Sequence, residues 1–222
     1  MKEWKKVKLG DISKTNLNQY SLKEDWIGIE YLDTGNITNN AITALQYIPN
    51  NNSLPSRARR KVEKLDIVYS TVRPNQKHFG IIEKPTRNML VSTGFCVIHC
   101  LEGESDPYFI YHYLSQDKIV NFLHAIAEQS VSAYPSIRAI DIENMELLIP
   151  DYNEQVKIGK FFKSLDDKIA LNKRINDNLF FIFVLFIIEI TEKQLIIKKQ
   201  STKKTINERP ILKREPAYSI AS

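Results

Sequence analysis

Short apolar runs separate the first 150 residues into segments typical of β-strands. Three runs are rich in β-branched or aromatic residues and are bounded by proline, glycine or charge; they are residues 65–71, 79–82 and 94–101. A fourth run, residues 145–150, ends in a proline and also predicts a strand. These segments are too short and too β-branched to favour helices.

Helical periodicity appears between the third and fourth strands. After Pro107, apolar residues recur near helical spacing as far as Ile126, which predicts a helix. A second short helix is expected to begin near Tyr134 and Pro135. Strands and helices therefore mix without regular alternation, and we expect residues 1–152 to form one α+β globular domain.

Residues 153–190 carry one long helical pattern, with Asn153 as the expected N-cap and Glu154 in the first turn. Residues at alternating spacings of four and three form a heptad seam: Ile158, Phe162, Leu165, Ile169, Asn172, Asn176, Leu179, Phe183 and Phe186. We expect a coiled-coil-forming helix that pairs with another helix; the alternative is a helix packed onto its own domain. The two asparagines would fix register and partner number. Residues 191–222 are expected to form a basic, disordered tail.

The charge is distributed unevenly along the chain. The net charge of +5 lies in residues 191–222, so residues 1–190 are neutral as a whole. Within them, residues 55–90 carry nine Lys or Arg against three acids, and residues 101–155 carry ten acids against two basic residues. A basic face beside an acidic one suits a protein that binds phosphates on one side and a basic partner on the other; a solvated surface is the alternative.

No catalytic or cofactor-binding motif is found. The chain has no glycine-rich phosphate loop and no Asn-Pro dipeptide of the kind used to methylate a base amino group. Strand alternation places Cys96 and Cys100 on one face and His99 on the other, so they do not converge on a metal. We therefore expect neither an enzyme nor a metal site.

Targeting and membrane signals are also missing from the sequence. The first residues are charged, and the longest apolar run, residues 179–188, is well short of the roughly 20 residues of a membrane helix. Two cysteines give no disulfide framework. A cytoplasmic protein without membrane contact is expected.

The basic stretch and its neighbours hold the residue types that read and orient DNA. Arg and Lys pair with guanine, Asn and Gln pair with adenine, and hydroxyl groups contact phosphates. The candidate DNA-binding residues are Arg57, Arg59, Arg60, Ser70, Thr71, Arg73, Asn75, Gln76, Lys77, His78, Ser92, Thr93, Tyr134 and Ser136.

Five stretches, in this order, resemble the specificity subunits of type I restriction-modification systems. They are WKKVKLGDI at 4–12; PSRARR at 55–60 with DIVYSTVRPNQKH at 66–78; VSTGFCV at 91–97; SAYPSI at 132–137; and IPDYNEQVKIG at 149–159 with LDDKI at 165–169. The resemblance covers about residues 1–180. It identifies residues 1–152 with a target recognition domain and the following helix with the family's long helix.

The resemblance implies a non-catalytic, DNA-recognising role. Partners would be double-stranded DNA, methyltransferase (modification) subunits and a restriction subunit that translocates and cleaves DNA. Those partner subunits, not this chain, would bind S-adenosylmethionine, ATP and magnesium. A full family member has two recognition halves whose helices pair antiparallel, whereas this chain has one. A second copy, or another specificity half, would then supply the opposing helix.

Two other functions are compatible with the same residues. One is a stand-alone dimeric DNA-binding protein, such as a regulator. The other is an inert truncated specificity cassette, because the segment from Phe180 onward departs from the family in its richness in Phe and Ile. A nuclease is a remote further alternative.

Overall fold

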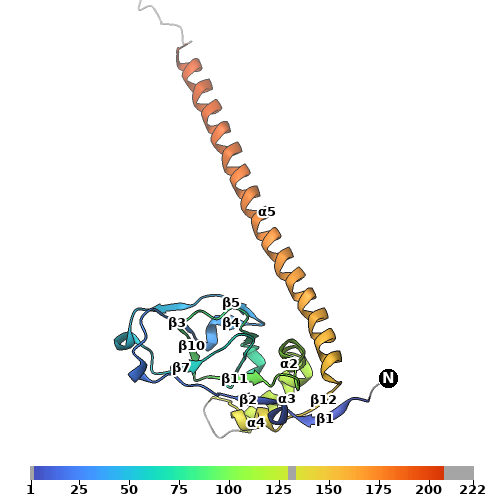
Figure 1. Ribbon diagram of the computed structural model, residues 1–222. Coiled ribbons are helices and arrows are strands. Elements are labelled where there is room, and N and C mark those ends of the chain that lie inside the picture. The colour runs from blue at the N-terminus through green and yellow to red at the C-terminus, as the bar shows by residue number, and fades with distance from the viewer. Residues whose placement is uncertain (1–2, 130–133, 208–222) are drawn as a thin grey trace, which may run out of the picture. The chain divides into compact units, whose positions relative to one another are not determined.

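A computed structural model describes residues 3–129 and 134–207, with side chains described as far as residue 199. The chain divides into a globular unit that extends to Asp166 and a helical unit that begins at Asp167. Figure 1 shows the strands and short helices of the first unit, and the α+β fold with a following long helix is confirmed.

Two four-stranded sheets form the globular unit. In the first, all neighbours are antiparallel, in the order β2 (Ser13–Thr15), β11 (Phe95–Cys100), β8 (Ile67–Ser70), β9 (Phe79–Ile81). The second has the order β6 (Gln46–Ile48), β3 (Ile29–Leu32), β10 (Met89–Ser92), β7 (Ala58–Lys61), and only its β3–β10 pair is parallel. The three strands predicted from residues 65–71, 79–82 and 94–101 are confirmed as β8, β9 and β11.

The first sheet is buried on both faces. Along β8 and β11, alternate residues enter two different cores: Ile67 and Cys96 join the helix-covered core, while Val68 and Phe95 face residues of the second sheet. This arrangement explains why both strands appear as continuous apolar runs in the sequence. Burial also raises the pKa of the Cys96 thiol to about 12, as expected for a core cysteine.

Two short antiparallel ribbons complete the strands. The strand predicted at 145–150 is confirmed as β12 (Glu146–Ile149), which pairs with β1 (Lys5–Lys8). The second ribbon joins β4 (Ile37–Thr38) to β5 (Ala41–Ile42).

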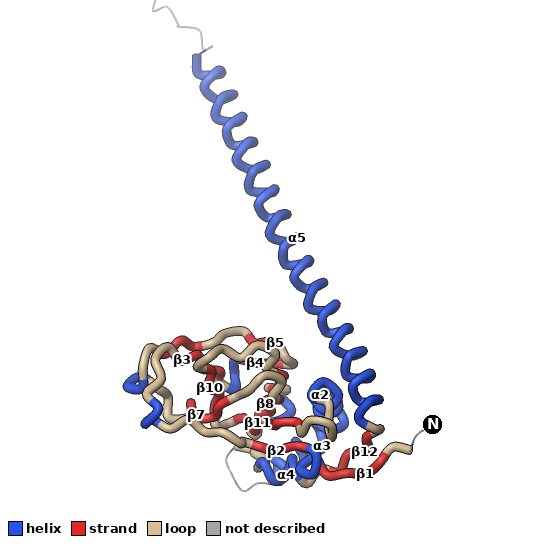
Figure 2. Tube along the Cα trace, in the orientation of Figure 1, coloured by secondary structure: helices blue, strands red, loops and turns tan. Residues whose placement is uncertain are grey.

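Short helices cover the first sheet (Figure 2). They are α1 (Leu9–Ile12), α2 (Pro107–Leu114), α3 (Asp117–Glu128) and α4 (Ala139–Glu143). The helix predicted from Pro107 to Ile126 is broken in two, because Gln116 is extended with φ −62° and ψ 136°. Asp106 caps α2, its carboxylate accepting a hydrogen bond from the Phe109 N–H at 2.9 Å.

The helix expected to begin near Tyr134 was placed too early. The described part of that segment is extended, and α4 begins only at Ala139. Backbone groups at Pro135 and Ile137 bond to the loop after β8 instead of to a helical turn, since the Arg73 N–H donates to Pro135 and the Ile137 N–H donates to Thr71. These tertiary hydrogen bonds override the local helical pattern.

The long helix α5 (Tyr152–Asn207) differs from the sequence prediction at both ends. Its N-cap is Asp151, not Asn153, because the Asp151 carboxylate accepts from the Glu154 N–H at 3.2 Å. The helix continues past the expected end at residue 190, with support from an ion pair between Lys193 and Glu189 at 2.6 Å. Good helix formers are sufficient there without amphipathic periodicity. Residues 208–222 of the expected tail lie outside the described residues. So does Ser132, the first residue of the SAYPSI stretch.

Gln155 fixes the start of α5 on the globular unit. Its side chain is fully buried; it accepts from the Asp106 N–H at 3.1 Å and donates to the carbonyl oxygens of Glu104 at 3.3 Å and Pro150 at 3.1 Å. One turn later Gly159 lies so close to Asp106 that a Cβ atom there would overlap with the Asp106 carboxylate. One amide side chain therefore ties the start of α5 to residues 104–106 and to Pro150.

We predict that Gln155→Ala lowers the free energy of unfolding by about 1–3 kcal/mol, because it leaves buried backbone groups without a partner. Urea unfolding measures the change. Lys157→Ala, at an exposed residue of the same turn, should alter the value by no more than about 0.5 kcal/mol. Equal stabilities for the two variants would contradict the role of Gln155.

Candidate nucleic-acid interface

Four segments that carry the predicted DNA-binding residues meet through backbone hydrogen bonds. The Thr93 N–H donates to the carbonyl of Arg57 at 2.8 Å, and the Thr71 N–H donates to that of Gly94 at 2.8 Å. The Arg73 N–H donates to the carbonyl of Pro135 at 2.9 Å. We call these segments, residues 56–57, 71–77, 92–94 and 134–136, the loop cluster.

The strand order explains why these loops share one edge. Strands β8 and β10 end at Ser70 and Ser92, whereas their antiparallel neighbours β11 and β7 begin at Phe95 and Ala58. The loops that follow or precede these strands must therefore emerge at matching ends. A bridge between Val72 and Ser136 extends the cluster to the segment before α4.

Six predicted side chains in the loop cluster are exposed: Arg57, Arg73, Asn75, Gln76, Thr93 and Tyr134. They include two guanidinium groups and two amides, the side chains best suited to base edges. The guanidinium carbon of Arg73 lies 5.4 Å from the centre of the Tyr134 ring, a cation–π arrangement.

The turn that carries Asn75 and Gln76 has an unusual backbone. A 3₁₀ turn over Pro74–Gln76 is flanked by Arg73 at φ 46° and Lys77 at φ 57°, both in the left-handed region. Such conformations cost free energy in non-glycine residues and concentrate at binding and catalytic sites. The turn leaves both amide side chains exposed at its tip.

Arg57 lies over Gly94, and the lack of a side chain there makes the approach possible. A Cβ atom at Gly94 would lie 2.5 Å from the Arg57 guanidinium and 2.9 Å from the Thr34 methyl group. Both distances are far shorter than a normal contact. Gly94 therefore fixes where the Arg57 side chain can lie.

The two other predicted arginines have partners inside the globular unit. Arg59 donates to the Ala58 carbonyl at 2.8 Å, and Arg60 donates to the side-chain oxygen of Asn16. Burial lowers the pKa of the half-buried Arg60. These two guanidinium groups stabilise β7 and the loop after β2.

Lys77 and His78 also have intramolecular partners. The Lys77 ammonium forms an ion pair of 2.6 Å with Asp117 at the start of α3. Nδ1 of His78 lies 2.6 Å from the Ile37 carbonyl and 3.1 Å from the Thr38 hydroxyl. Both side chains connect the loop cluster to neighbouring elements.

The predicted hydroxyl groups at Ser70, Thr71 and Ser92 hold the loops in shape. Ser70 is buried and donates to the Val72 carbonyl at 2.9 Å, and Thr71 donates to the Gly94 carbonyl at 2.9 Å. Ser92 is fully buried and accepts from the Gly94 N–H at 3.3 Å. Sequence reasoning does not distinguish these roles from phosphate contacts.

Sequence reasoning missed the β4–β5 hairpin, which adjoins the loop cluster. The Asn39 N–H donates to the Lys77 carbonyl at 2.9 Å, and the Asn40 N–H donates to that of Phe79 at 2.9 Å. Asn39 and Asn40 both have positive φ angles. The available signal was the adjacent asparagine pair between β-branched residues, which is typical of a tight hairpin turn.

The predicted helix seam is divided between packing and exposure. Ile158 packs against the helix-covered core, and the Phe162 ring lies 4.8 Å from the His112 ring, measured between centroids. The remaining predicted seam residues are exposed: Leu165, Ile169, Asn172, Asn176, Leu179, Phe183 and Phe186. The start of the helix thus packs on its own domain, whereas the later seam is uncovered.

No group of three or more potential metal ligands occurs among the side chains described in residues 3–129 and 134–199. Among the helices that the structure describes, α5 included, none has the length and apolar character needed to span a membrane.

Residues 1–180 match the family of type I restriction modification DNA specificity domains. Among curated proteins, the chain is similar to the specificity subunit of the type I restriction enzyme HindI from Haemophilus influenzae, with 31% identity over 179 residues. That similarity covers 81% of this chain and 39% of the relative.

Two solved structures have a similar fold. One is the HsdS subunit from Thermoanaerobacter tengcongensis, with 25% identity and a TM-score of 0.65, covering 78% of this chain and 44% of that one. The other is a chain from a study of complex assembly and conformational transition of the type I R-M system, with 26% identity, a TM-score of 0.66 and the same coverage. The chain spans less than half the length of these relatives.

We predict that Gly94→Ala lowers the free energy of unfolding by about 1–3 kcal/mol, because the new methyl group overlaps with the methyl group of the short Thr34 side chain, whereas the flexible end of Arg57 can move away. Gly35→Ala is the matched control, since a Cβ atom there would meet nothing within 4 Å; we expect a change within about 0.5 kcal/mol. Chemical denaturation compares the two. If Gly94→Ala were as stable as Gly35→Ala, Thr34 would not approach Gly94 as closely as the structure has it.

Proposed function

The chain belongs to the family of type I restriction-modification DNA specificity domains, and from this premise we propose that it selects the DNA sequence on which such an enzyme acts. The observation that carries the proposal is the loop cluster, in which four distant segments meet and two of them, residues 56–57 and 71–77, present Arg57, Arg73, Asn75 and Gln76 together. In this proposal the chain itself neither cleaves nor methylates DNA.

Specific and orienting contacts would come from different side chains. Arg and Gln or Asn make bidentate pairs with guanine and adenine in the major groove, which an exposed tip such as Pro74–Gln76 can enter. Thr93 and Tyr134 would contact phosphate and sugar and so fix the orientation. Arg59, Arg60, Lys77 and His78 are not included among the primary contacts, because each is engaged within the domain.

Catalysis would be supplied by separate subunits. We propose that modification subunits bind S-adenosylmethionine and a restriction subunit binds ATP and magnesium, with this chain placing both on the target. The proposal is supported by family membership and by a similar solved chain that comes from a study of type I R-M complex assembly.

We further propose that two copies associate through α5 and together read a two-fold symmetric split site. The support is the seam of exposed apolar residues, among them Ile169 at 67% and Leu179 at 58% exposure. An uncovered apolar seam is costly in water. Closed two-fold symmetry makes the two recognition domains identical, and identical domains read inverted half-sites.

For DNA recognition, we predict that Arg57→Ala and Arg73→Ala weaken binding by the assembled methyltransferase. A base-reading arginine should cost about 1–3 kcal/mol and relax specificity at one base, and a phosphate contact should reduce the salt slope by about one. Fluorescence anisotropy with cognate and scrambled duplexes at several salt concentrations distinguishes the two roles.

Arg87→Ala is the matched control for these variants. Arg87 is exposed but precedes β10, so it lies at the end of the strand away from the loop cluster, and its removal should leave binding unchanged. Unaltered binding in the double variant Arg57→Ala, Arg73→Ala would refute the proposed DNA face.

For assembly, we predict two copies of this chain per complex with modification subunits, as measured by sedimentation velocity. Replacing Asn172 and Asn176 with leucine should tighten self-association and loosen control of orientation and copy number, because the polar layers set register. Asn178→Leu is the control, since residue 178 lies off the seam. A complex with a single copy would contradict the two-copy proposal.

A further inference from the structure

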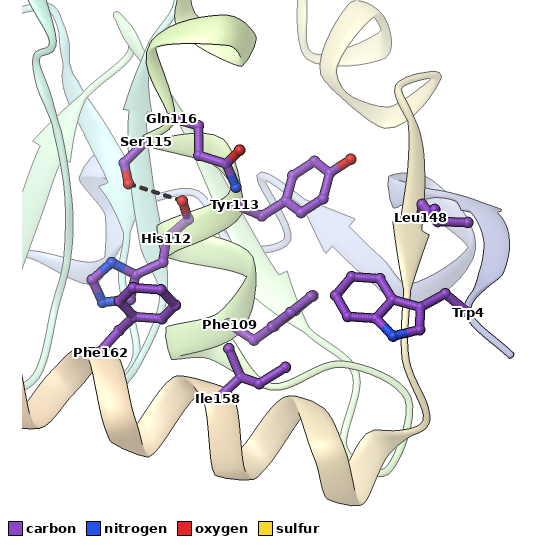
Figure 3. Close-up of a pocket in the computed structure, with 9 residues that line it drawn as sticks. All are labelled: Trp4, Phe109, His112, Tyr113, Ser115, Gln116, Leu148, Ile158 and Phe162. Atoms are coloured by element: carbon purple, nitrogen blue, oxygen red, sulfur yellow. Dashed lines mark hydrogen bonds between the residues drawn. The ribbon is translucent and has the colours of Figure 1, made fainter. Parts of the chain in front are cut away.

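An apolar pocket of about 590 Å³ lies in the globular unit beside the first turns of α5 (Figure 3). Its lining comes from the segment before β1, from α2 and the two residues after it, from β12 and from α5: Trp4, Phe109, His112, Tyr113, Ser115, Gln116, Leu148, Ile158 and Phe162. Trp4 is 47% exposed and Leu148 is 52% exposed. Ile158 and Phe162 are also the first two residues of the helix seam, so the pocket shares part of its lining with the start of the seam.

Within this part of the helix, the distribution of charge favours an antiparallel second copy as the partner of α5. Residues 158–173 carry four lysines against two aspartates, a net charge of +2. Residues 175–190 carry Asp177 and Glu189 and no basic residue, a net charge of −2. In an antiparallel pair, the positive half of one helix lies beside the negative half of the other. In a parallel pair in register, halves of the same charge lie side by side.

The two seam asparagines then fix the register. A two-fold axis beside residue 174 places Asn172 against Asn176 of the second copy, so that the buried amides can bond to each other. Moving the two-fold axis to the next position along the helix that still pairs seam residues with seam residues would place each asparagine opposite Ile, Leu or Phe. The chosen axis also keeps every other layer apolar, with Ile169 opposite Leu179 and Leu165 opposite Phe183.

The same register determines what lies over the pocket. Phe162 faces Phe186 of the second copy, and Ile158 faces Ile190, which continues the seam four residues beyond Phe186. Phe186 is 58% exposed and Ile190 is 37% exposed in the single chain. The pocket and this helix segment are thus two uncovered apolar surfaces that one symmetry operation brings together, twice in each dimer.

We infer that the pocket is the docking site for Phe186 and Ile190 of a second copy of this chain. The inference rests on the two-copy proposal made above, and it adds the register and a contact between the helix of one copy and the globular unit of the other. Leu148 and Trp4 widen the covered area beyond the narrow stripe that a helix pair alone buries.

The fluorescence of Trp4 reports directly whether the pocket is occupied. The chain has two tryptophans, so Trp26→Phe in the full-length protein leaves Trp4 as the only one. As concentration rises and the chain self-associates, Trp4 emission should move to shorter wavelength, because the indole leaves water. Self-association measured by sedimentation with unchanged Trp4 emission would overturn the inference while leaving the two-copy proposal intact.

Two variants of the helix distinguish the proposed pocket contact from other parts of the helix surface. Ile190→Asp should abolish the Trp4 shift and weaken self-association by about tenfold or more. Ile188→Asp is the control, because residue 188 lies on the side of the helix away from the seam, and it should change neither quantity. Equal effects of the two substitutions would overturn the inference.

A pocket variant outside the helix completes the test. Leu148 is an exposed residue of β12 between buried Leu147 and Ile149. Leu148→Asp should weaken self-association by about tenfold as well, and thermal unfolding followed by circular dichroism verifies that the variant folds. Unchanged association would overturn the pocket assignment. A Trp4 shift that requires added modification subunit would assign the pocket to that partner instead, and no self-association at any concentration would refute both proposals.

Discussion

Backbone hydrogen bonds between loops are the constraint on which the proposed recognition surface depends. The links from Thr93 to Arg57, Thr71 to Gly94 and Arg73 to Pro135 use main-chain atoms only. Loop position is therefore independent of most side chains at the surface, and Arg57, Asn75 or Gln76 can change without moving the segments that carry them. A scaffold of this kind can present different base-reading groups in the same geometry.

A second set of contacts joins the domain proposed to recognise DNA to the helix proposed to mediate assembly. Buried Gln155 ties the start of α5 to the segment before α2 and to the end of β12, and Gly159 allows the helix to approach Asp106 closely. The strand β1 pairs with β12, so the beginning of the chain reaches the same place. Any partner that binds along α5 is thus anchored to the domain that carries the loop cluster.

The elements that depend on a local sequence pattern were predicted correctly. The predictions failed where contacts with residues distant in the sequence determine the structure. Strands β8 and β11 are buried on both faces, so their apolar runs were visible, whereas exposed β6 and the mixed strand β7, with its Arg and Lys, carried no such signal. The helix expected at Tyr134 is replaced by bonds to the loop after β8, which no local pattern encodes. In the candidate site, residue type did not reveal that Arg60 is held by Asn16 or that Lys77 pairs with Asp117.

The central claim is that the exposed side chains of the loop cluster choose the DNA sequence that is modified. Methylome sequencing of cells that carry this gene with its modification subunit tests it most directly, with Asn75→Ala, Gln76→Ala as the variant and the unchanged chain as reference. One methylated motif is expected for the reference, and loss or relaxation of one or two base positions is expected for the variant. An identical motif in both strains, at equal levels of the assembled complex, would contradict it.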